Sequence, residues 1–413
     1  MSEHDPNLPL VTIVTPSYNQ GRFIRETIES VLNQDYPNIE YIVIDNASTD
    51  STADVIKPYL KRLTYISEPD NGQSHAINKG FALARGSIVA WLNSDDVFLP
   101  GAVSNAVAAF TAHPEAAVIY GEGFQIDVDS NVKQRFPFTQ HFDRWKLVFL
   151  SDYILQQTVF FRKAALDDVG PLREDLDWVM DWEILIRLAK KYEFIQLPDY
   201  LGSLREHEAA KTSQGGIVRA GEIRRMLAEH CRMPFPPGYQ VYGFVTYEHV
   251  WTKTIEAWPK WLEPLGTFLC KAIRKVLFKL VNRAMVHGQR WYRDLWMAPR
   301  AQVMLSEGSG EAIMHGQVPG NIPGLEKQRV RVLNRGMVLA DEAFGHGKFE
   351  LRFAVPEQPA GTSPILDIEA SESFVLAKIG LSTDKRTLSF KMFDIGWVHP
   401  KTFALSAPLA QSA

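Results

Sequence analysis

The stretch "VAWLNSDDVFLPG", from Val89 to Gly101, takes four apolar residues directly into a polar turn that contains Asp95 and Asp96. The apolar residues predict a buried strand. Two adjacent carboxylates repel each other and are costly unless a cation, hydrogen-bond donors or water compensates them. The pair at the end of this strand therefore indicates a site for something positively charged.

The sequence before this stretch repeats a pattern of short apolar strands and helices. The runs "LVTIVT" (10–15), "IEYIVID" (39–45) and "SIVAWL" (87–92) are rich in β-branched residues, and segments with helical spacing separate them. Continuous apolar strands that alternate with helices predict a parallel sheet covered on both faces. Ligands of such sheets bind beyond the carboxyl ends of the strands.

Polar residues follow three of these strands. The first run leads into Pro16-Ser17-Tyr18-Asn19, the second ends in Asp45–Asp50, and the third ends in the Asp95-Asp96 pair. We therefore expect these groups to meet at one edge of the sheet. For Ser48 and Asp50 the alternative, plain turn and N-cap chemistry, stays open.

The chemistry of this edge suits a nucleotide with a metal. The sequence contains no Walker loop, and no G-x-G-x-x-G follows the first strand, which disfavours a dinucleotide site. Pro16, Tyr18 and Asp45 form a corner suited to a nucleobase. Carboxylates suit Mg²⁺ or Mn²⁺, which proteins commonly hold together with substrate phosphates. The Gly-rich turn in "DNGQSHAINKG" (70–80) starts a helix, where backbone N–H groups favour phosphate.

Three stretches together resemble the inverting glycosyltransferases of family 2, which have the GT-A fold. They are "TIVTPSYNQGRFIRETIESVLNQDYPNIEYIVIDNASTDST" (12–52), "EPDNGQSHAINKGFALARGSIVAWLNSDD" (68–96) and "MDWEILIRLAKK" (180–191). The resemblance covers residues 10–213, and bacterial members that build surface polysaccharides are the most similar. It implies a nucleotide-sugar donor, with a UDP-sugar as the expected one, Mg²⁺ or Mn²⁺, and a glycan or lipid-linked acceptor.

The resemblance also implies a role for each site residue. Asp181 matches the catalytic base that takes a proton from the acceptor, Asp95 is the expected metal ligand, and His207 matches a histidine near the metal or diphosphate. The remaining residues would bind the donor: Pro16, Tyr18 and Asp45 at the base, Asp70, Asn78 and Lys79 along the ribose and diphosphate, and Asn93 and Asp96 beside the metal. Asn93 departs from the family pattern, because an Asp usually begins the metal motif.

Alternatives to these assignments stay open. Asp181 could be a helix-start carboxylate without a catalytic role, and His207 a structural histidine. A non-catalytic glycan-binding or scaffold protein could use the same fold, although the intact Asp95 and Asp181 speak against it. A sugar-phosphate nucleotidyltransferase needs a Gly-rich loop with Arg or Lys after the first strand, which "PSYNQGRF" (16–23) matches poorly.

The rest of the chain predicts two further parts. We expect a GT-A domain over 1–215 with a Rossmann-like, mostly parallel α/β sheet. A helical, basic amphipathic segment follows over 216–298. Short alternating runs separated by turns predict a β-sandwich-like accessory domain over 299–413.

The charge is distributed unevenly. The net charge is −4, which argues against nucleic-acid binding, yet residues 260–300 carry +7. Within them, 268–285 predicts a basic amphipathic helix that contacts an anionic membrane surface. The alternative is a helix docked on the catalytic domain with its basic face in water. Neither a signal peptide nor an apolar run of membrane-spanning length is evident, so we expect a cytoplasmic protein, peripheral on the inner face of the cytoplasmic membrane.

Overall fold

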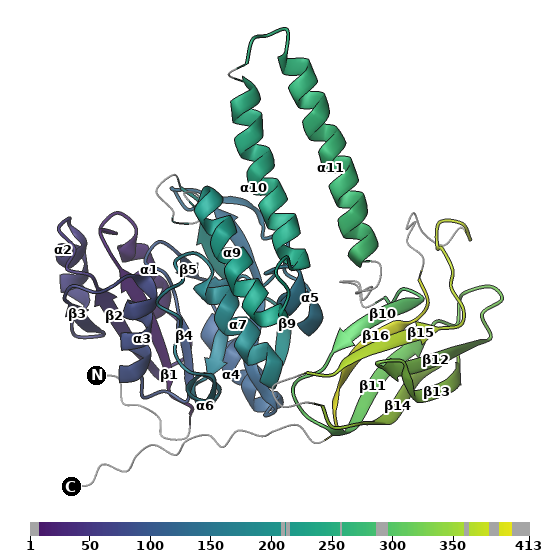
Figure 1. The fold of residues 1–413 in the computed structure, drawn as a ribbon. Helices are drawn as coiled ribbons and strands as arrows, with labels where there is room; N and C mark the ends of the chain where they lie inside the picture. The colour runs from purple at the N-terminus through teal and green to yellow at the C-terminus, as the bar shows by residue number, and fades with distance from the viewer. Residues whose placement is uncertain are drawn as a thin grey trace.

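The computed structural model describes residues 8–207, 211, 215–256, 258–285, 296–358, 363–379 and 388–398. Figure 1 shows an α/β domain, a pair of long helices that project from it, and a domain of β-strands. These parts follow one another along the chain in the predicted order. The predicted fold class is therefore confirmed, and the boundaries chosen for the three domains stay predictions.

The first half of the α/β domain alternates strands and helices as predicted. Its strands lie side by side in the order β3-β2-β1-β4 and are parallel. The elements are β1 Val11–Ser17, α1 Ile24–Leu32, β2 Ile39–Asp45, α2 Thr52–Ile56, η1 Lys57–Tyr59, β3 Thr64–Ser67, α3 Gln73–Leu83 and β4 Ile88–Trp91. Every residue of β1 is buried, because helices cover both faces of the sheet.

The second half continues the same sheet in the order β4-β8-β6-β9-β5, with β7 paired to β6. Its elements are β5 Val97–Phe98, α4 Ala102–Ala112, β6 Ala116–Ile126, β7 Val132–Arg135, α5 Arg144–Phe149, η2 Gln156–Thr158, β8 Phe160–Arg162, α6 Lys163–Val169, α7 Met180–Lys191 and β9 Glu193–Arg205. Strands β6 and β9 run in the direction of β4, whereas β5, β7 and β8 run the opposite way. The sequence pattern did not indicate β9, which ends at Arg205, before the expected end of the domain at 215.

Two hydrophobic cores lie on the two faces of this sheet. Helices α1, α2 and α4 cover one face, and α3, α5, α6 and α7 cover the other. The second face also receives Ile223, Met226 and Leu227 from the next helix, α9 (Gly216–Cys231). Helix α9 thus belongs to the packing of the α/β domain rather than to a separate helical unit.

Helix α3 comes very close to the sheet at one point. A Cβ atom on Gly80 would lie 2.3 Å from Cγ1 of Val14 in β1. Only a residue without a side chain permits this approach. It lets α3 lie flat on β1, so that the beginning of α3 reaches the carboxyl edge of the sheet.

Beyond α9, helices α10 (Pro237–Glu256) and α11 (Glu263–Met285) form a hairpin that extends away from both domains (Figure 1). The helices meet at Gly266, where a Cβ atom would lie 2.9 Å from Ile255 and 3.1 Å from Trp258. None of the helices in the described part of the chain combines the length and the apolar character needed to cross a bilayer.

The C-terminal domain consists of two antiparallel sheets, with strand orders β10-β15-β12-β13 and β14-β11-β16. The strands are β10 Arg300–Met304, β11 Gly310–Val318, β12 Lys327–Asn334, β13 Met337–Gly345, β14 Gly347–Val355, β15 Ile365–Ala370 and β16 Lys391–Trp397. Side chains such as Met314, Val332 and Phe390 are buried together in one core. Alternating buried and exposed residues in β14 produce this sandwich, as the sequence predicts.

Candidate active site

The carboxyl ends of β1, β2 and β4 lie next to one another. Ser17 in β1 is in register with Asp45 in β2, and the N–H of Leu92, after β4, donates to the carbonyl of Val14 at 2.9 Å. Pro16 is buried within β1, whereas the ring of Tyr18 is exposed at the edge. The three polar strand ends therefore meet at one edge of the sheet.

Asp45 is completely buried at this edge and holds the following loop. Its carboxylate accepts hydrogen bonds from the N–H of Ser48 at 2.9 Å, the hydroxyl of Ser48 at 2.5 Å and the hydroxyl of Ser67 at 2.8 Å. Asp50 accepts from the N–H groups of Gly21 and Thr52. Ser48 and Asp50 thus stabilise the turn and the start of α2, as the alternative interpretation of these residues predicts.

Asp70, Asn78 and Lys79 lie on or before helix α3. The carboxylate of Asp70 accepts from the N–H of Gly72 at 2.8 Å, at the start of the helix. Asn78 exchanges hydrogen bonds with the backbone of Leu172, at 2.8 and 2.9 Å, and Lys79 pairs with Glu68. Asn78 thus connects α3 to the segment before α7.

The turn after β4 separates the two carboxylates of the opening motif. Asp95 is half-buried, whereas Asp96 is only 1% exposed. The carboxylate of Asp96 accepts from Gln157 Nε2 at 2.6 Å, from the N–H of Arg205 at 2.9 Å and from Asn93 Nδ2 at 3.0 Å. Burial and the charge of Asp95 raise the pKa of Asp96 to about 8, and these three donors act in the opposite direction. Asp96 is thus held inside the turn by three donors, and the less buried Asp95 is the carboxylate of the pair nearer the surface.

Asp95 and His207 come together although 112 positions separate them in the chain. His207 Nε2 lies 3.0 Å from Asp95 Oδ2, and the imidazole packs on the ring of Phe23 with centroids 4.9 Å apart. Arg205 donates to the carbonyl of Asp95 at 2.8 Å and pairs with Glu26 at 2.6 Å. These contacts fix the end of β9 against the acidic turn.

A carboxylate and an imidazole are suitable ligands for a divalent cation that also binds phosphate oxygens. Within the described residues, no group of three His, Cys, Asp or Glu side chains forms a closed metal site. The Asp95–His207 pair would therefore supply part of a coordination shell and leave positions for a diphosphate.

Asp181 lies in the first turn of α7, beside a second carboxylate that sequence reasoning did not identify. This second group is Asp152, in the loop before η2, and both side chains are half-buried. Burial raises the pKa of Asp181, while the N–H of Trp182 and the charge of Arg219 lower it. Burial and the neighbouring Asp181 raise the pKa of Asp152 well above its usual range. Paired carboxylates whose pKa values are pushed apart can divide acid and base roles.

Helix α9 supports the start of α7. The carboxylate of Glu222, which is buried, accepts from the N–H groups of Asp177, Trp178 and Val179 at 3.0, 2.7 and 3.1 Å. These donors precede α7 directly, and their positive ends favour a carboxylate. Glu222 thereby fixes the backbone that carries Asp181.

A chain of polar contacts leads from the acidic turn toward Asp181. Gln73 Nε2 donates to Asn93 Oδ1 at 2.8 Å, and Lys211 Nζ donates to Gln73 Oε1 at 3.3 Å. Burial lowers the pKa of Lys211, while the carboxylates of Asp177, Glu222 and Asp181 raise it. Lys211 is thus within electrostatic reach of Asp181 and connects the two halves of the site.

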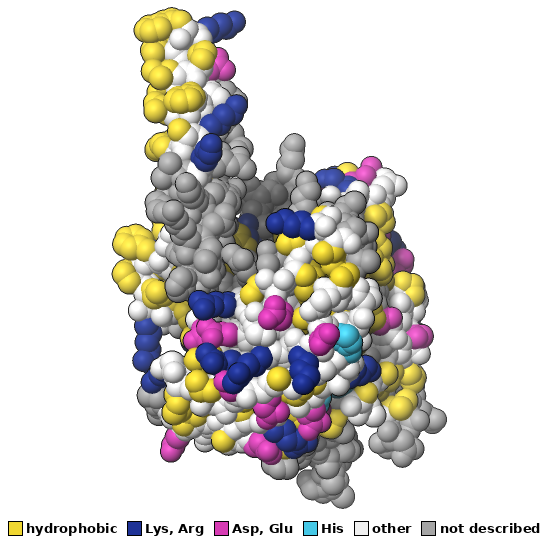
Figure 2. Space-filling view, turned by 90° about the vertical axis from the view of Figure 1, so that its right-hand side faces the viewer, with side chains coloured by type: hydrophobic (Ala, Val, Ile, Leu, Met, Phe, Trp, Pro, Cys, Tyr) yellow, Lys and Arg dark blue, Asp and Glu magenta, His cyan; other side chains and the backbone are white. Residues whose placement is uncertain are grey.

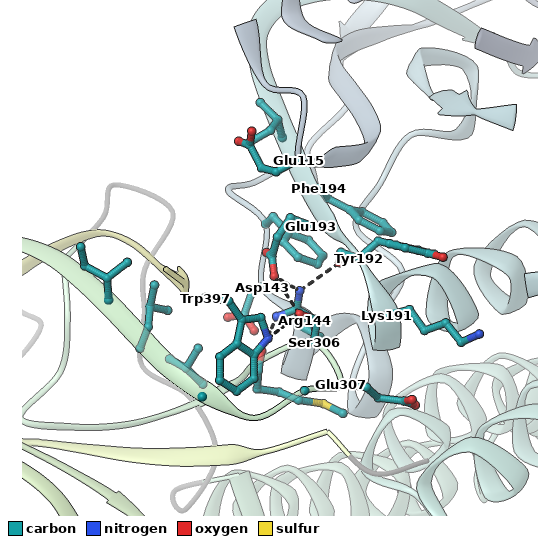
Figure 3. A pocket seen from close by; sticks show the side chains of 18 of the residues that line it. Glu115, Asp143, Arg144, Lys191, Tyr192, Glu193, Phe194, Ser306, Glu307 and Trp397 are labelled. Carbon is teal, nitrogen blue, oxygen red and sulfur yellow. Dashed lines mark hydrogen bonds and ion pairs between the residues drawn. The ribbon is translucent and has the colours of Figure 1, made fainter. Parts of the chain in front are cut away.

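The pocket in Figure 3, of about 530 Å³, lies elsewhere, between the α/β domain and the β domain. Glu115 and Glu193 mark its position at the amino ends of β6 and β9, opposite the carboxyl edge. Its polar groups pair with one another: Trp397 Nε1 donates to Ser306 Oγ at 3.0 Å, Ser306 Oγ donates to Glu193 Oε1 at 3.2 Å, and Arg144 donates to the same carboxylate at 2.6 Å. This arrangement is a junction between domains rather than a catalytic centre.

Sequence reasoning also missed Gln157, Arg205, Lys211, Arg219 and Glu222. Polar residues of these types occur throughout a soluble protein, and their spacing carries no signal of its own. The stretch "LREHEAAKTS" drew attention to His207, and Arg205 stands two residues before it. Only the return of β9 to the edge of the sheet brings them to the acidic turn.

Comparison with known proteins finds similarity to glycosyltransferases. Residues 12–170 match the family described as Glycosyl transferase family 2. The O-antigen biosynthesis protein RfbC of Myxococcus xanthus is 31% identical over 235 residues, which cover 54% of this chain and 18% of RfbC. The putative teichuronic acid biosynthesis glycosyltransferase TuaG of Bacillus subtilis is 42% identical over 93 residues, which cover 21% of this chain and 36% of TuaG.

Among solved structures, S. aureus TarS 1-349 in complex with UDP-GlcNAc superposes with a TM-score of 0.44 at 19% identity, over 68% of this chain and 93% of that one. This chain spans well under two thirds of the length of RfbC and of TuaG.

Proposed function

We propose, from the premise that the N-terminal domain of this chain belongs to glycosyltransferase family 2, that the protein transfers a sugar from a nucleotide-diphosphate donor to a glycan or lipid-linked acceptor with inversion. A UDP-sugar is the donor we favour. One observation carries the proposal: His207 pairs with Asp95 in the acidic turn, and Gln73 joins Asn93 of the same turn to Lys211, whose ammonium feels the charge of Asp181. A diphosphate and an acceptor hydroxyl could therefore be bound close together.

Asp181 would act as the general base. It takes the proton from an acceptor hydroxyl while that oxygen forms a bond to the anomeric carbon of the donor sugar. The bond between this carbon and the diphosphate breaks, and the nucleoside diphosphate leaves. Because Asp152 has the more strongly raised pKa, a proton in this region would reside on Asp152, and Asp181 would stay ionised as a base must.

The donor would lie along the carboxyl edge of the sheet. Tyr18, with Pro16 and Asp45 beneath it, would hold the base, and the start of α3 at Asp70 would face the diphosphate, supported by Asn78 and Lys79. Asp95 and His207 would hold Mg²⁺ or Mn²⁺, with Asn93 and Asp96 behind them. When bound, such an ion neutralises charge on the departing diphosphate.

The acceptor proposal follows from the resemblance to proteins of surface-polysaccharide synthesis. We propose that the enzyme works in the cytoplasm on the inner face of the membrane, where a lipid-linked saccharide is presented. Contact with anionic lipid through the basic segment 268–285 would keep the enzyme there.

Donor screening tests the proposed reaction. Full-length protein is incubated with UDP-, dTDP- and GDP-sugars and Mg²⁺ or Mn²⁺, and nucleoside diphosphate release is measured with and without candidate acceptors. We expect one donor class to bind, and Asp181→Asn to keep donor binding but to lose about 10²–10⁴-fold in transfer rate. Asp167→Asn, an exposed carboxylate in α6, is the matched control and should retain full activity.

The proposal fails if no donor binds with either ion, or if Asp181→Asn transfers sugar at the native rate. Retention of the anomeric configuration in the product would contradict the inverting mechanism.

A further inference from the structure

The tip of the α10–α11 hairpin carries large apolar side chains in contact with solvent. Trp261, in the turn, is 78% exposed, and Phe268 is 67% exposed. The same surface includes further exposed apolar residues: Trp258, Leu265, Leu269 and Ile273. Figure 2 shows apolar side chains along one side of the projecting hairpin. Exposed aromatics gathered at the end of an extension mark an interaction site rather than ordinary surface.

The exposed apolar residues of α11 form one stripe. Leu265, Phe268, Leu269 and Ile273 have the spacing i, i+3, i+4 and i+8, which places them on one face of a helix. Gly266 and Cys270, on a different face, are buried, and Gly266 faces Ile255 and Trp258 at the end of α10. Helix α11 therefore packs on α10 with one face and leaves a second apolar face uncovered.

Positive charge lies on the side of the hairpin away from this uncovered face. Lys260 in the turn and Lys271 and Lys275 in α11 are exposed, and Glu263 is the one acidic residue in the sequence from 258 to 285. Figure 2 shows Lys and Arg side chains along the hairpin on the side away from the apolar ones. Tryptophan and phenylalanine flanked by lysines suit the boundary between acyl chains and anionic headgroups.

We propose that the hairpin tip, residues 258–273, inserts into the interface of an anionic lipid bilayer, with Trp261 and Phe268 as the anchoring side chains. This proposal refines the membrane contact proposed for 268–285: the apolar stripe provides the attachment, and the lysines contribute attraction to acidic lipid. A second copy of the chain is the alternative occupant of the stripe, and sedimentation distinguishes it from lipid.

The hairpin also sets the distance between the membrane and the active site. At its base, the ring of Tyr242 in α10 lies 5.5 Å from the ring of Trp182, the residue that follows Asp181. From Tyr242 to Glu256 the helix rises by about 20 Å at 1.5 Å per residue. Resting on the proposed function, the hairpin holds the general base at most this far from the bilayer, on the side where a lipid-linked saccharide is presented.

Vesicle flotation with the full chain tests this proposal. Native protein should float with vesicles that contain about one third phosphatidylserine and remain in the dense fraction with phosphatidylcholine alone. Replacing both anchors, Trp261→Glu with Phe268→Glu, should lower the partition coefficient at least ~100-fold. Lys271→Glu should lower it about fivefold, and only with acidic lipid.

The matched control is Met337→Glu with Val338→Glu, two apolar residues at the start of β13 that are 51% and 50% exposed, and this variant should float like the native protein. The proposal is overturned if native protein does not float, if the Trp261/Phe268 variant floats equally well, or if phosphatidylcholine alone suffices. It is also overturned if sedimentation reveals a dimer that only this variant dissociates, because a second copy would then cover the stripe.

Donor binding, measured without vesicles, separates this proposal from the proposed function. The Trp261/Phe268 variant should bind donor like native protein, which also shows that it is folded. Asp181→Asn should still float. Failure of donor binding with intact flotation would remove the proposed function and leave the membrane contact in place.

Discussion

Buried charged side chains have opposite surroundings at the two ends of the α/β sheet. At the carboxyl edge, Asp152 and Asp181 lie close enough for Asp181 to raise the pKa of Asp152. At the amino end, Arg144 is almost fully buried, and its guanidinium donates to the carbonyls of Ala189, Met304 and Tyr192 and to the carboxylate of Glu193. The first end places two carboxylates together, and the second surrounds one buried cation with three carbonyls and a carboxylate.

This contrast distinguishes a candidate active site from a structural junction. Perturbed carboxylates gathered at one edge are typical of catalytic groups, whereas a buried cation bonded through all three of its nitrogens joins parts of a fold. The pocket of Figure 3 is lined by the second kind of group, so its size is a poor guide to function.

Asp181→Asn gives the largest expected contrast between activity and stability. Because burial raises the pKa of Asp181, removing this charge should not reduce the free energy of unfolding, while the transfer rate should fall about 10²–10⁴-fold. Chemical denaturation and a transfer assay on the same sample measure both. A variant that loses stability in proportion to activity would place Asp181 among structural residues.

Arg144→Met should have the opposite effect. Three carbonyls and Glu193 would lose their buried partner, so we expect a loss of about 3–5 kcal/mol in the free energy of unfolding. Because one of these carbonyls belongs to Met304 in the β domain, limited proteolysis should also cut between the domains sooner. Arg352→Met, which removes only surface ion pairs, is the control and should leave the free energy of unfolding essentially unchanged.

Glu222→Gln tests whether α9 supports the catalytic helix. Loss of the charge that accepts three N–H groups should cost about 1.5–3 kcal/mol and should lower the transfer rate. Glu229→Gln on the same helix affects an exposed pair with Arg173 and should cost under about 1 kcal/mol. Equal losses in the two variants would contradict the supporting role.

Asp143→Asn should give the smallest effect, and its size depends on pH. Burial raises the pKa of Asp143, the N-cap of α5, to about 6 from 3.8. A raised pKa means that the native state loses stability as the pH rises from about 4 through 6, because a buried charge forms. Asparagine caps helices equally well, so the variant should match the native protein near pH 4 and exceed it by about 1–2 kcal/mol at pH 7. The prediction is contradicted if the difference in unfolding free energy between variant and native protein is the same at pH 4 and pH 7.

The strand and helix pattern of residues 10–96 could be predicted because each element is determined locally. The apolar runs of β1, β2 and β4 end in polar residues, and parallel strands necessarily bring such ends to one edge. The acidic turn was found for the same reason. Strand β9 was not predicted, because its polar middle, with Pro198 inside, lacks the alternation of a half-buried strand.

The helices after residue 215 show the limit of pattern reading. Helices α9 and α11 are both amphipathic in sequence, yet α9 buries Ile223, Met226 and Leu227 against the sheet and α11 leaves Phe268 and Leu269 exposed. The spacing of apolar residues in the sequence predicts that a helix has an apolar face, but it does not predict which part of the protein covers that face.

The sequence by itself determined the order of strands and helices, the acidic turn after β4 and Asp181 at the start of a helix. Only the tertiary structure decided which groups meet: His207 with Asp95, Asp152 with Asp181, and Glu222 with the start of α7. The physical reason is that periodicity and turn chemistry act over a few neighbouring residues. The pairings join positions tens to more than a hundred residues apart, and they exist only once both cores have packed on the sheet.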